Sequence, residues 1–509
     1  MNKKTVIFIL LIFNFVSCSD FLDVNENPNY PTKVDDYLII PASQSSIASV
    51  MSADYGLIGG FWSQYWAQNN TSSQYKIFET YTLSSNSNNV DGAYLEMFTG
   101  GLSDNEIIHL KAKRNKNWGL YLMTSVIKSY GFQYLVDLYG NVPYTEAFLG
   151  ESGNYSPKID KGEDIYIAIY ALLNEALENV KQNNITGIDS RYKDCDLFLE
   201  GNIDYWVGFA NSLKLKILLR QYYVNTSWVE SELTKLLQNG DFLIKDVSLV
   251  NFEDVDSKSN PLYEADQRRL NTKTNIRANA TFTSYLKANG DTRINKLFEV
   301  VNNEILGMIT GSYEIPSSEW KAPDIISKPI MTPIMPVYLM TLAESDLLLA
   351  EASVRIGDVV NAKKYYDEGV LESFKRMGLD GTLFIAPGAV YQFPTVNTES
   401  RIKAIIMQKW IDAADGQRGC ESFIEQVRTG YPEVASKDIQ EKISEGNEND
   451  LPIGYIPGTL VYSKKGATGG VFPKRLPYAD CELNYNENAT DYRGLSDMQV
   501  MLSNVWWKQ

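Results

Sequence analysis

Residues 61–81 combine aromatic rings with side-chain amides, a combination that suits non-catalytic sugar binding. A flat ring packs against the C–H face of a pyranose, and amides pair with its hydroxyls. We predict ligand contacts from Trp62, Trp66 and Tyr75. Because Trp62, Tyr65 and Trp66 stand at i, i+3 and i+4, their spacing also fits a helix that buries an aromatic stripe. The segment contains Phe61, Trp62, Tyr65, Trp66, Tyr75, Phe78 and Tyr81, interleaved with Gln64, Gln68, Asn69, Asn70 and Gln74.

A second aromatic pair stands in a segment without helical periodicity. Tyr313 and Trp320 flank Pro316 in SYEIPSSEWKAP, where no helix face is available to bury them. Loops carry many binding residues, so both rings are predicted ligand contacts. The alternative is that they anchor the loop by packing onto the helices.

The single histidine, His109, restricts the chemistry that the chain can perform. It argues against a Ser-His-Asp or Cys-His nucleophile pair and excludes a multi-histidine zinc site. We interpret His109, within IIHLKAK, as a structural residue and predict no catalytic residue. Glycoside hydrolysis needs only two carboxylates, so a carboxylate-pair glycosidase remains an alternative.

The sequence contains no signal for a cofactor. A phosphate-binding loop and a dinucleotide fingerprint are both absent, and we expect no cofactor. The acidic spacings Asp194-x-Asp196 and Asp254-x-Asp256 do not continue into a calcium loop with a central Gly and a terminal Glu. We predict no metal ligands, and a structural calcium ion is left open.

The composition indicates a large globular protein that does not bind nucleic acid. The 509 residues carry 47 basic and 63 acidic side chains, and a net charge of −16 opposes contact with phosphate backbones. Apolar residues make up 44% of the chain and aromatic residues 12%, which excludes disorder as the main state.

The N-terminus predicts an exported, lipid-anchored protein. Residues 1–17 contain two lysines and then an apolar run that is too short to span a membrane, as in a secretory signal peptide. Phe15-Val16-Ser17-Cys18 resembles a bacterial lipobox, so we predict acylation of Cys18 and attachment to a membrane. The remaining cysteines, Cys195, Cys420 and Cys481, have no patterned spacing, and their disulfide state is left open.

Helical periodicity dominates residues 18–509, which we predict to form a single, mostly α-helical domain. The strongest helix signals are a capping pattern at Asp160–Glu163, a second one at Ser227–Glu230, and a helical hairpin at 341–377. The hairpin resembles a tetratricopeptide unit, with Ala350, Ala362 and Tyr366 at the helix contact. Further helices are expected at 119–139, 203–223 and 401–428, with long irregular loops near 241–335 and 430–480.

Six sequence segments in order along the chain are FLDVNENPNYPT (21–32), LVDLYGNVPYTEA (135–147), WVGFANSLKLKILLR (206–220), LMTLAESDLLLAEASVRIGD (339–358), QKWIDA with RTGYP (408–432) and FPKRLPYADCELNYN (472–486). We interpret them physically as helix stops and scaffold rather than as a binding site. Their sequences and their order resemble the SusD/RagB family, and their details look most like its second SusD-like subfamily.

The resemblance implies a SusD-like fold of tetratricopeptide-like helix pairs in a cell-surface lipoprotein of the outer membrane. Such a protein is expected to capture an oligosaccharide, or in some members an oligopeptide, and to pass it to a SusC-like TonB-dependent transporter without covalent chemistry. The family's binding residues vary between members, so the resemblance transfers none of them. A helical-repeat scaffold that binds protein partners remains a further alternative.

Overall fold

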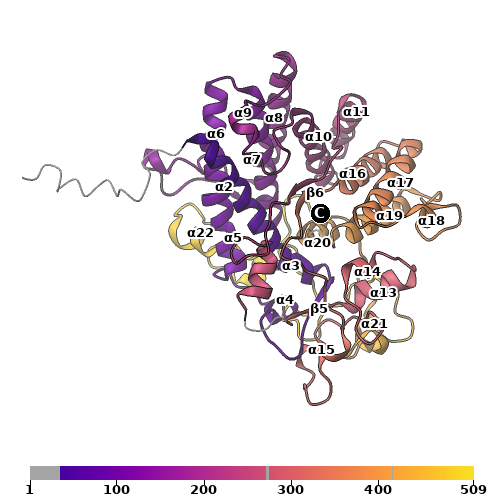
Figure 1. Cartoon of the computed structure of the whole chain (residues 1–509). Coiled ribbons are helices and arrows are strands. Elements are labelled where there is room, and N and C mark those ends of the chain that lie inside the picture. Colours follow the sequence, from indigo (N-terminus) through magenta and orange to yellow (C-terminus); the bar gives the residue numbers. More distant parts are fainter. Residues whose placement is uncertain (1–34, 271–273, 415–416, 509) are drawn as a thin grey trace, which may run out of the picture.

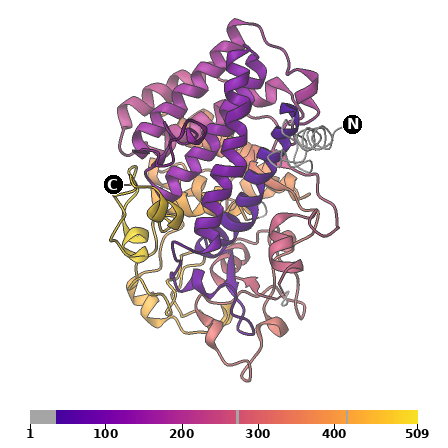
Figure 2. The ribbon, with the colours of Figure 1, turned by 90° about the vertical axis from the view of Figure 1, so that its left-hand side faces the viewer.

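Long helices from distant parts of the chain make up most of the molecule (Figure 1), which is described by a computed structural model over residues 35–270, 274–414 and 417–508. Helices α6 to α11 lie at the top of Figure 1, and shorter elements including α13, α15 and α21 lie at the bottom. Figure 2 shows the same division after a 90° turn, with the purple helices above the pink and yellow segments. The mostly helical, tetratricopeptide-like fold is confirmed.

The longer helices lie within the four blocks 36–139, 162–239, 342–376 and 398–429. The helices are α2 (Asp36–Ser49), α3 (Tyr55–Trp62), α4 (Lys76–Glu79), α5 (Ala93–Glu96), α6 (Ser103–Arg114), α7 (Trp118–Tyr139), α8 (Gly162–Gln182), α9 (Ser190–Lys193), α10 (Ile203–Arg220), α11 (Thr226–Asn239), α12 (Pro261–Tyr263), α13 (Ala280–Ala288), α14 (Ile294–Leu297), α15 (Ala322–Ile325), α16 (Leu342–Arg355), α17 (Val359–Arg376), α18 (Thr382–Ile385), α19 (Thr398–Asp412), α20 (Gly419–Thr429), α21 (Lys437–Lys442), α22 (Asp480–Tyr485) and α23 (Asp497–Leu502). None of the helices in these ranges has the length and apolar character needed to cross a bilayer.

The strands of the described ranges form three small antiparallel pairs. Strand β1 (Trp66–Gln68) pairs with β5 (Ile276–Ala278), and β2 (Val142–Pro143) pairs with β3 (Ile159–Asp160). Strand β4 (Val247–Leu249) pairs with β6 (Val337–Met340), with an irregular register between Val247 and Ser248. Each strand pair therefore holds together two segments that are separated in sequence.

The predicted hairpin at 341–377 is present as α16 and α17. Gly357 takes a positive φ of 83° between them, and the Asp358 carboxylate caps α17 by accepting from the backbone N–H of Asn361 at 3.1 Å. Ala350, Ala362 and Tyr366 are buried, as the tetratricopeptide-like spacing predicts.

The two predicted capping patterns are wrong in their details. The Asp160 carboxylate does not cap α8, because it accepts instead from the backbone N–H groups of Tyr144 and Thr145 and holds the β2–β3 turn. Helix α11 begins at Thr226, so Ser227 lies inside the helix.

The region predicted as one helix at 401–428 consists of α19 and α20. Gln417 takes a positive φ of 63°, which a continuous α-helix does not allow, and Arg418 then turns inward. Within 241–335, predicted as a long irregular loop, the structure contains the short strands β4 and β5 and the helix α13, which was not predicted. The Asn279 side chain caps α13 by accepting from the Thr281 N–H.

A set of buried charged side chains, here called the ion cluster, joins α7, α10, α16, α19 and α20. None of these side chains is more than 4% exposed, so each charge depends on its protein partners rather than on water. The ion cluster consists of Asp137, Lys216, Arg220, Glu344, Glu351, Lys409, Asp412, Arg418, Glu421, Glu425 and Arg428.

Arg220 connects three helices within the ion cluster. Its guanidinium donates to Asp137 of α7 at 2.9 Å and to Glu421 of α20 at 2.7 Å, and it also bonds Glu425. Arg428 lies in the last turn of α20, where its side chain is buried and pairs with Glu351 of α16 and Glu425. Since a buried charge left unpaired is costly, these pairs fix how the helices face one another.

Replacing Arg220 with Met leaves the carboxylates of Asp137, Glu421 and Glu425 without their guanidinium partner. We expect R220M to lower the free energy of unfolding by about 3–5 kcal/mol, measured by urea denaturation at pH 7. The control R191M removes an exposed pair, which water and salt screen, and is expected to lower the stability much less. Equal losses in the two variants would contradict a stabilising role of the Arg220 pairs.

The ion cluster also predicts how stability depends on pH. Burial raises the pKa of Glu421, but the charges of Lys216, Arg220 and Lys409 outweigh burial and lower it to about 2. Because the folded pKa lies below the ordinary value of 4.5, this contribution is complete above pH 4.5 and is lost as the pH falls toward 2.

We therefore expect the free energy of unfolding to fall steeply between pH 4.5 and 2. The variant E421Q should be less stable at pH 7 and should lose part of this acid dependence. The exposed control E441Q on α21 should keep the full dependence. Urea titrations across this range measure both, and an unchanged acid slope in E421Q would refute the assignment.

Candidate functional site

The structure corrects the expectation that Trp62 and Trp66 present their rings to solvent. Trp62 is 3% exposed, donates its Nε1–H to the carbonyl of Phe78 at 3.1 Å, and packs edge-on against Phe423. Trp66 is also buried and lies against α3, where a Cβ on Gly60 would be 2.1 Å from the indole ring. All three rings of the i, i+3, i+4 pattern are buried, but α3 ends at Trp62 and Trp66 lies in β1, so they do not form a stripe on one helix.

Tyr75 and Tyr313 are buried as well, against expectation. The Tyr75 hydroxyl donates to Asp266 at 2.9 Å, and its ring stacks on Phe78. Tyr313 lies beneath Lys76, whose Nζ is 5.0 Å from the ring centroid. Both residues pack against segments that are far away in sequence.

Trp320 retains a partly exposed ring while also anchoring its loop. It packs against the small apolar cluster that includes Ala67 and Met308, and its carbonyl accepts from the Asn70 side chain at 2.8 Å. Of the predicted aromatic contacts, Trp320 is thus the one that keeps ring surface available.

A cleft of about 200 Å³, here called the central cleft, opens between the helical body and the irregular segments. Tyr65, Trp66 and Phe298 contribute aromatic side chains, and Ile330 and Met331 contribute partly exposed apolar ones. The volume is smaller than that of typical drug-sized sites, so it suits one sugar ring or one side chain. Its lining is completed by Lys296, Leu297, Pro329, Thr332, Met335, Ala414 and Gln417.

Backbone pairing positions the walls of the central cleft. The pairing of β1 with β5 sets Trp66, and the bridge between Phe298 and Pro329 joins the two loop segments of the opposite wall. On the helical side, α3 and α20 cross closely, because a Cβ on Gly59 would lie 2.1 Å from the carbonyl carbon of Gly419. The position of the walls of the central cleft therefore depends on close contacts between backbone segments.

Gln417 lines the central cleft and has one buried polar atom without a protein partner among the described residues. The side chain is buried, and its Oε1 accepts from the Ser52 hydroxyl. Within the described residues, its Nε2 has no hydrogen-bond acceptor. A buried donor left unpaired is unfavourable, so a ligand hydroxyl or carbonyl in the cleft would satisfy it.

A second hollow, the tyrosine cleft, has the most exposed aromatic rings, and sequence analysis missed it. Tyr155 is 81% exposed and Tyr485 80% exposed, and they border a cavity of about 270 Å³ with Phe98, Glu482 and Asn486. The signal that could have found Tyr155 is its position in the Gly- and Ser-rich segment GESGNYSPK. No sequence pattern near Tyr485 predicts that this residue lies at the same cavity as Tyr155.

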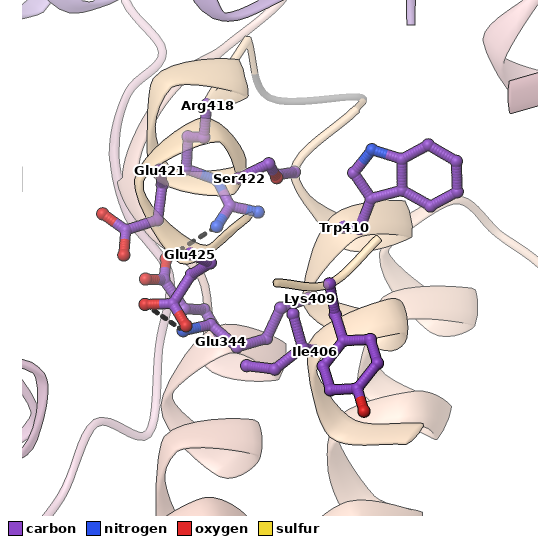
Figure 3. Close-up of a pocket in the computed structure, with 10 residues that line it drawn as sticks. Glu344, Ile406, Lys409, Trp410, Arg418, Glu421, Ser422 and Glu425 are labelled. Carbon is purple, nitrogen blue, oxygen red and sulfur yellow. Dashed lines mark hydrogen bonds and ion pairs between the residues drawn. The ribbon is translucent and has the colours of Figure 1, made fainter. Parts of the chain in front are cut away.

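The densest group of carboxylates does not form an accessible acid pair. Figure 3 shows Glu344, Glu421 and Glu425 around a cavity of about 10 Å³, room for about one water molecule. These side chains belong to the ion cluster and are paired with cations. A sugar cannot reach them, so the cluster is structural.

His109 is buried and structural. It stacks on Tyr121, and its Nδ1 hydrogen-bonds the Thr124 hydroxyl. Burial and the nearby Lys128 and Lys113 lower its pKa to about 3, so the imidazole is neutral at physiological pH.

The acidic and cysteine motifs also have structural roles in the described ranges. The Asp196 carboxylate accepts from the side chains of Gln44 and Trp206, and no group of three or more potential metal ligands occurs in the part of the chain that the structure describes. Cys195, Cys420 and Cys481 are free thiols. Cys18 lies outside the described residues.

Comparison with known proteins gives similarity along most of the chain. A SusD homologue from Bacteroides uniformis is 23% identical, with 93% of this chain and 100% of that one covered and a TM-score of 0.69. A chitin-binding SusD homologue from Flavobacterium johnsoniae is 21% identical, with coverages of 92% and 98% and a TM-score of 0.71. No curated protein matches the chain.

The family comparison agrees with the fold. The model of the second SusD-like family, described as starch-binding and associating with the outer membrane, matches residues 28–454. That range includes the helix pairs, the ion cluster and all the lining residues of the central cleft. The chain therefore belongs to the SusD-like family of starch-binding proteins that associate with the outer membrane.

Proposed function

We propose that this protein captures a nutrient at the outer membrane and passes it to a TonB-dependent transporter barrel without covalent chemistry. A glycan is the first ligand class and an oligopeptide the second. Membership in a starch-binding family and the chitin-binding relative support a glycan. The anchor in this proposal is acylated Cys18, which would hold the protein at the cell surface.

We place the ligand in the central cleft. The observation that carries this placement is the buried, unpaired Nε2 of Gln417 beside Tyr65, Trp66 and Phe298. A sugar hydroxyl can accept from Nε2 while the apolar C–H face of the ring packs on the partly exposed side chains of Ile330 and Met331. Trp320, with its partly exposed ring, is a further proposed contact outside the lining of this cleft.

The central cleft can be blocked from its rim. Ile330 lines it and is 41% exposed, whereas Ile334 is 58% exposed and does not line it. In a titration of intrinsic tryptophan fluorescence with chitin and starch oligosaccharides and mixed oligopeptides, we expect I330R to weaken binding at least tenfold, by about 1.4 kcal/mol, and the matched variant I334R to bind normally.

Two outcomes of this titration would refute the placement or the function. Loss of binding in Y155A or Y485A with normal binding in I330R would move the ligand to the tyrosine cleft. Release of shortened products from a labelled oligosaccharide would favour the glycosidase alternative, whereas the proposal expects none.

Delivery to a transporter predicts a stable complex in the membrane. Extraction of the native outer membrane in mild detergent, followed by affinity purification of this protein, should recover a large barrel protein. The variant C18A should reach the membrane poorly, since it lacks the acylated residue. Recovery of the anchored protein alone, with the barrel present in the extract, would contradict the proposed partnership.

A further inference from the structure

A groove of about 800 Å³ lies between α8, α10 and α11, in the helical half of the molecule (Figure 1). It shares no lining residue with the central cleft. Its walls carry the apolar side chains Leu177, Val180, Val207 and Leu236. This size falls within the range of cavities that hold specific ligands, about 300–1,000 Å³.

The groove contains a buried cation without a hydrogen-bonded anion. Lys214 is 8% exposed, and among the described residues its ammonium makes no hydrogen bond or ion pair. Its contacts are the ring of Tyr170, 5.4 Å from Nζ, and the longer-range charge of Glu232. Glu232 itself pairs with Lys235 and accepts from the Tyr170 hydroxyl, so its charge is largely used elsewhere.

The rim of the groove is more acidic than basic. Glu178 on α8, Asp204 on α10 and Asp241 after α11 are exposed carboxylates on three different elements. The exposed lysines at the rim are Lys181 and Lys235, and Lys235 is paired with Glu232. The carboxylates would repel an acidic peptide and attract basic side chains spread along a chain. The groove thus combines one buried cation, apolar walls and acidic lips.

We propose that this groove docks the C-terminal end of a partner polypeptide, with its terminal carboxylate on Lys214, apolar last residues on the walls and basic residues at the lips. A chain end fits because its carboxylate directly follows the last side chains, which the apolar walls beside Lys214 can hold. The terminal carboxylate supplies the one anion that Lys214 lacks, in a charge-assisted hydrogen bond. This interaction surface is additional to the nutrient site.

The titration of Lys214 predicts that the affinity of the groove for the chain end depends on pH. Burial lowers its pKa to about 8, although Glu232 acts in the opposite direction. The other ionisable groups around it are Tyr170, Glu178 and Lys181 on α8, Asp204 on α10, Lys235 on α11, and Asp241. Since the neutral amine cannot pair with a carboxylate, affinity for the chain end should fall as the pH rises past 8.

The test uses the purified full chain in detergent and a labelled, N-acetylated peptide ending in Lys-Lys-Gly-Leu-Leu. Fluorescence anisotropy compares the free C-terminal acid with its C-terminal amide. We expect the acid to bind at least tenfold more tightly than the amide. The variant K214M should abolish this difference, and the control K161M, outside the groove at the start of α8, should keep it.

The acid and amide comparison on the unaltered protein keeps the test valid even where K214M folds poorly. Equal affinities for acid and amide, binding of neither peptide, or an undiminished difference in K214M would each overturn the proposal. A requirement for a free N-terminal ammonium would overturn it as well, because the groove would then hold a free short peptide rather than a chain end.

Discussion

The pairing of buried charges in the ion cluster is the interaction on which the rest of the structure depends. Arg220 meets carboxylates from α7 and α20, and Arg428 meets one from α16. Removing such groups from water is costly, and each helix must therefore take the one position in which its charges find partners. The hydrophobic core provides most of the stabilisation, while the charges select one arrangement of the helices.

That arrangement also fixes the position of the central cleft. Arg418, Glu421 and Glu425 hold the start and middle of α20 in the helical body, and Gly419 brings the same helix against Gly59 of α3. Gln417 comes directly before this anchored segment, so its amide is placed by the scaffold. The opposite wall consists of irregular segments around residues 296–298 and 329–335, where changes of side chain would alter ligand preference with little effect on the core.

The sequence predicted the helices and the fold better than the site, for physical reasons. Helix periodicity and caps are local, so α7, α16 and α17 were predictable from neighbouring residues. The burial of Trp62 and Tyr75 depends on Phe423 and Asp266, which are distant in sequence. Arg428 was predictable as a charge in the last turn of a helix, but its pairing with Glu351 was not, because Glu351 lies in another helix. The tyrosine cleft and the groove at Lys214 likewise exist only after segments from several elements meet.

The most direct test of the account is an experimental structure of the protein with a bound oligosaccharide from the class that binds in solution. We expect a sugar ring in the central cleft, with one ring oxygen or hydroxyl within hydrogen-bond distance of Gln417 Nε2 and the C–H face against Met331. A sugar bound between Tyr155 and Tyr485, with the central cleft empty, would contradict it.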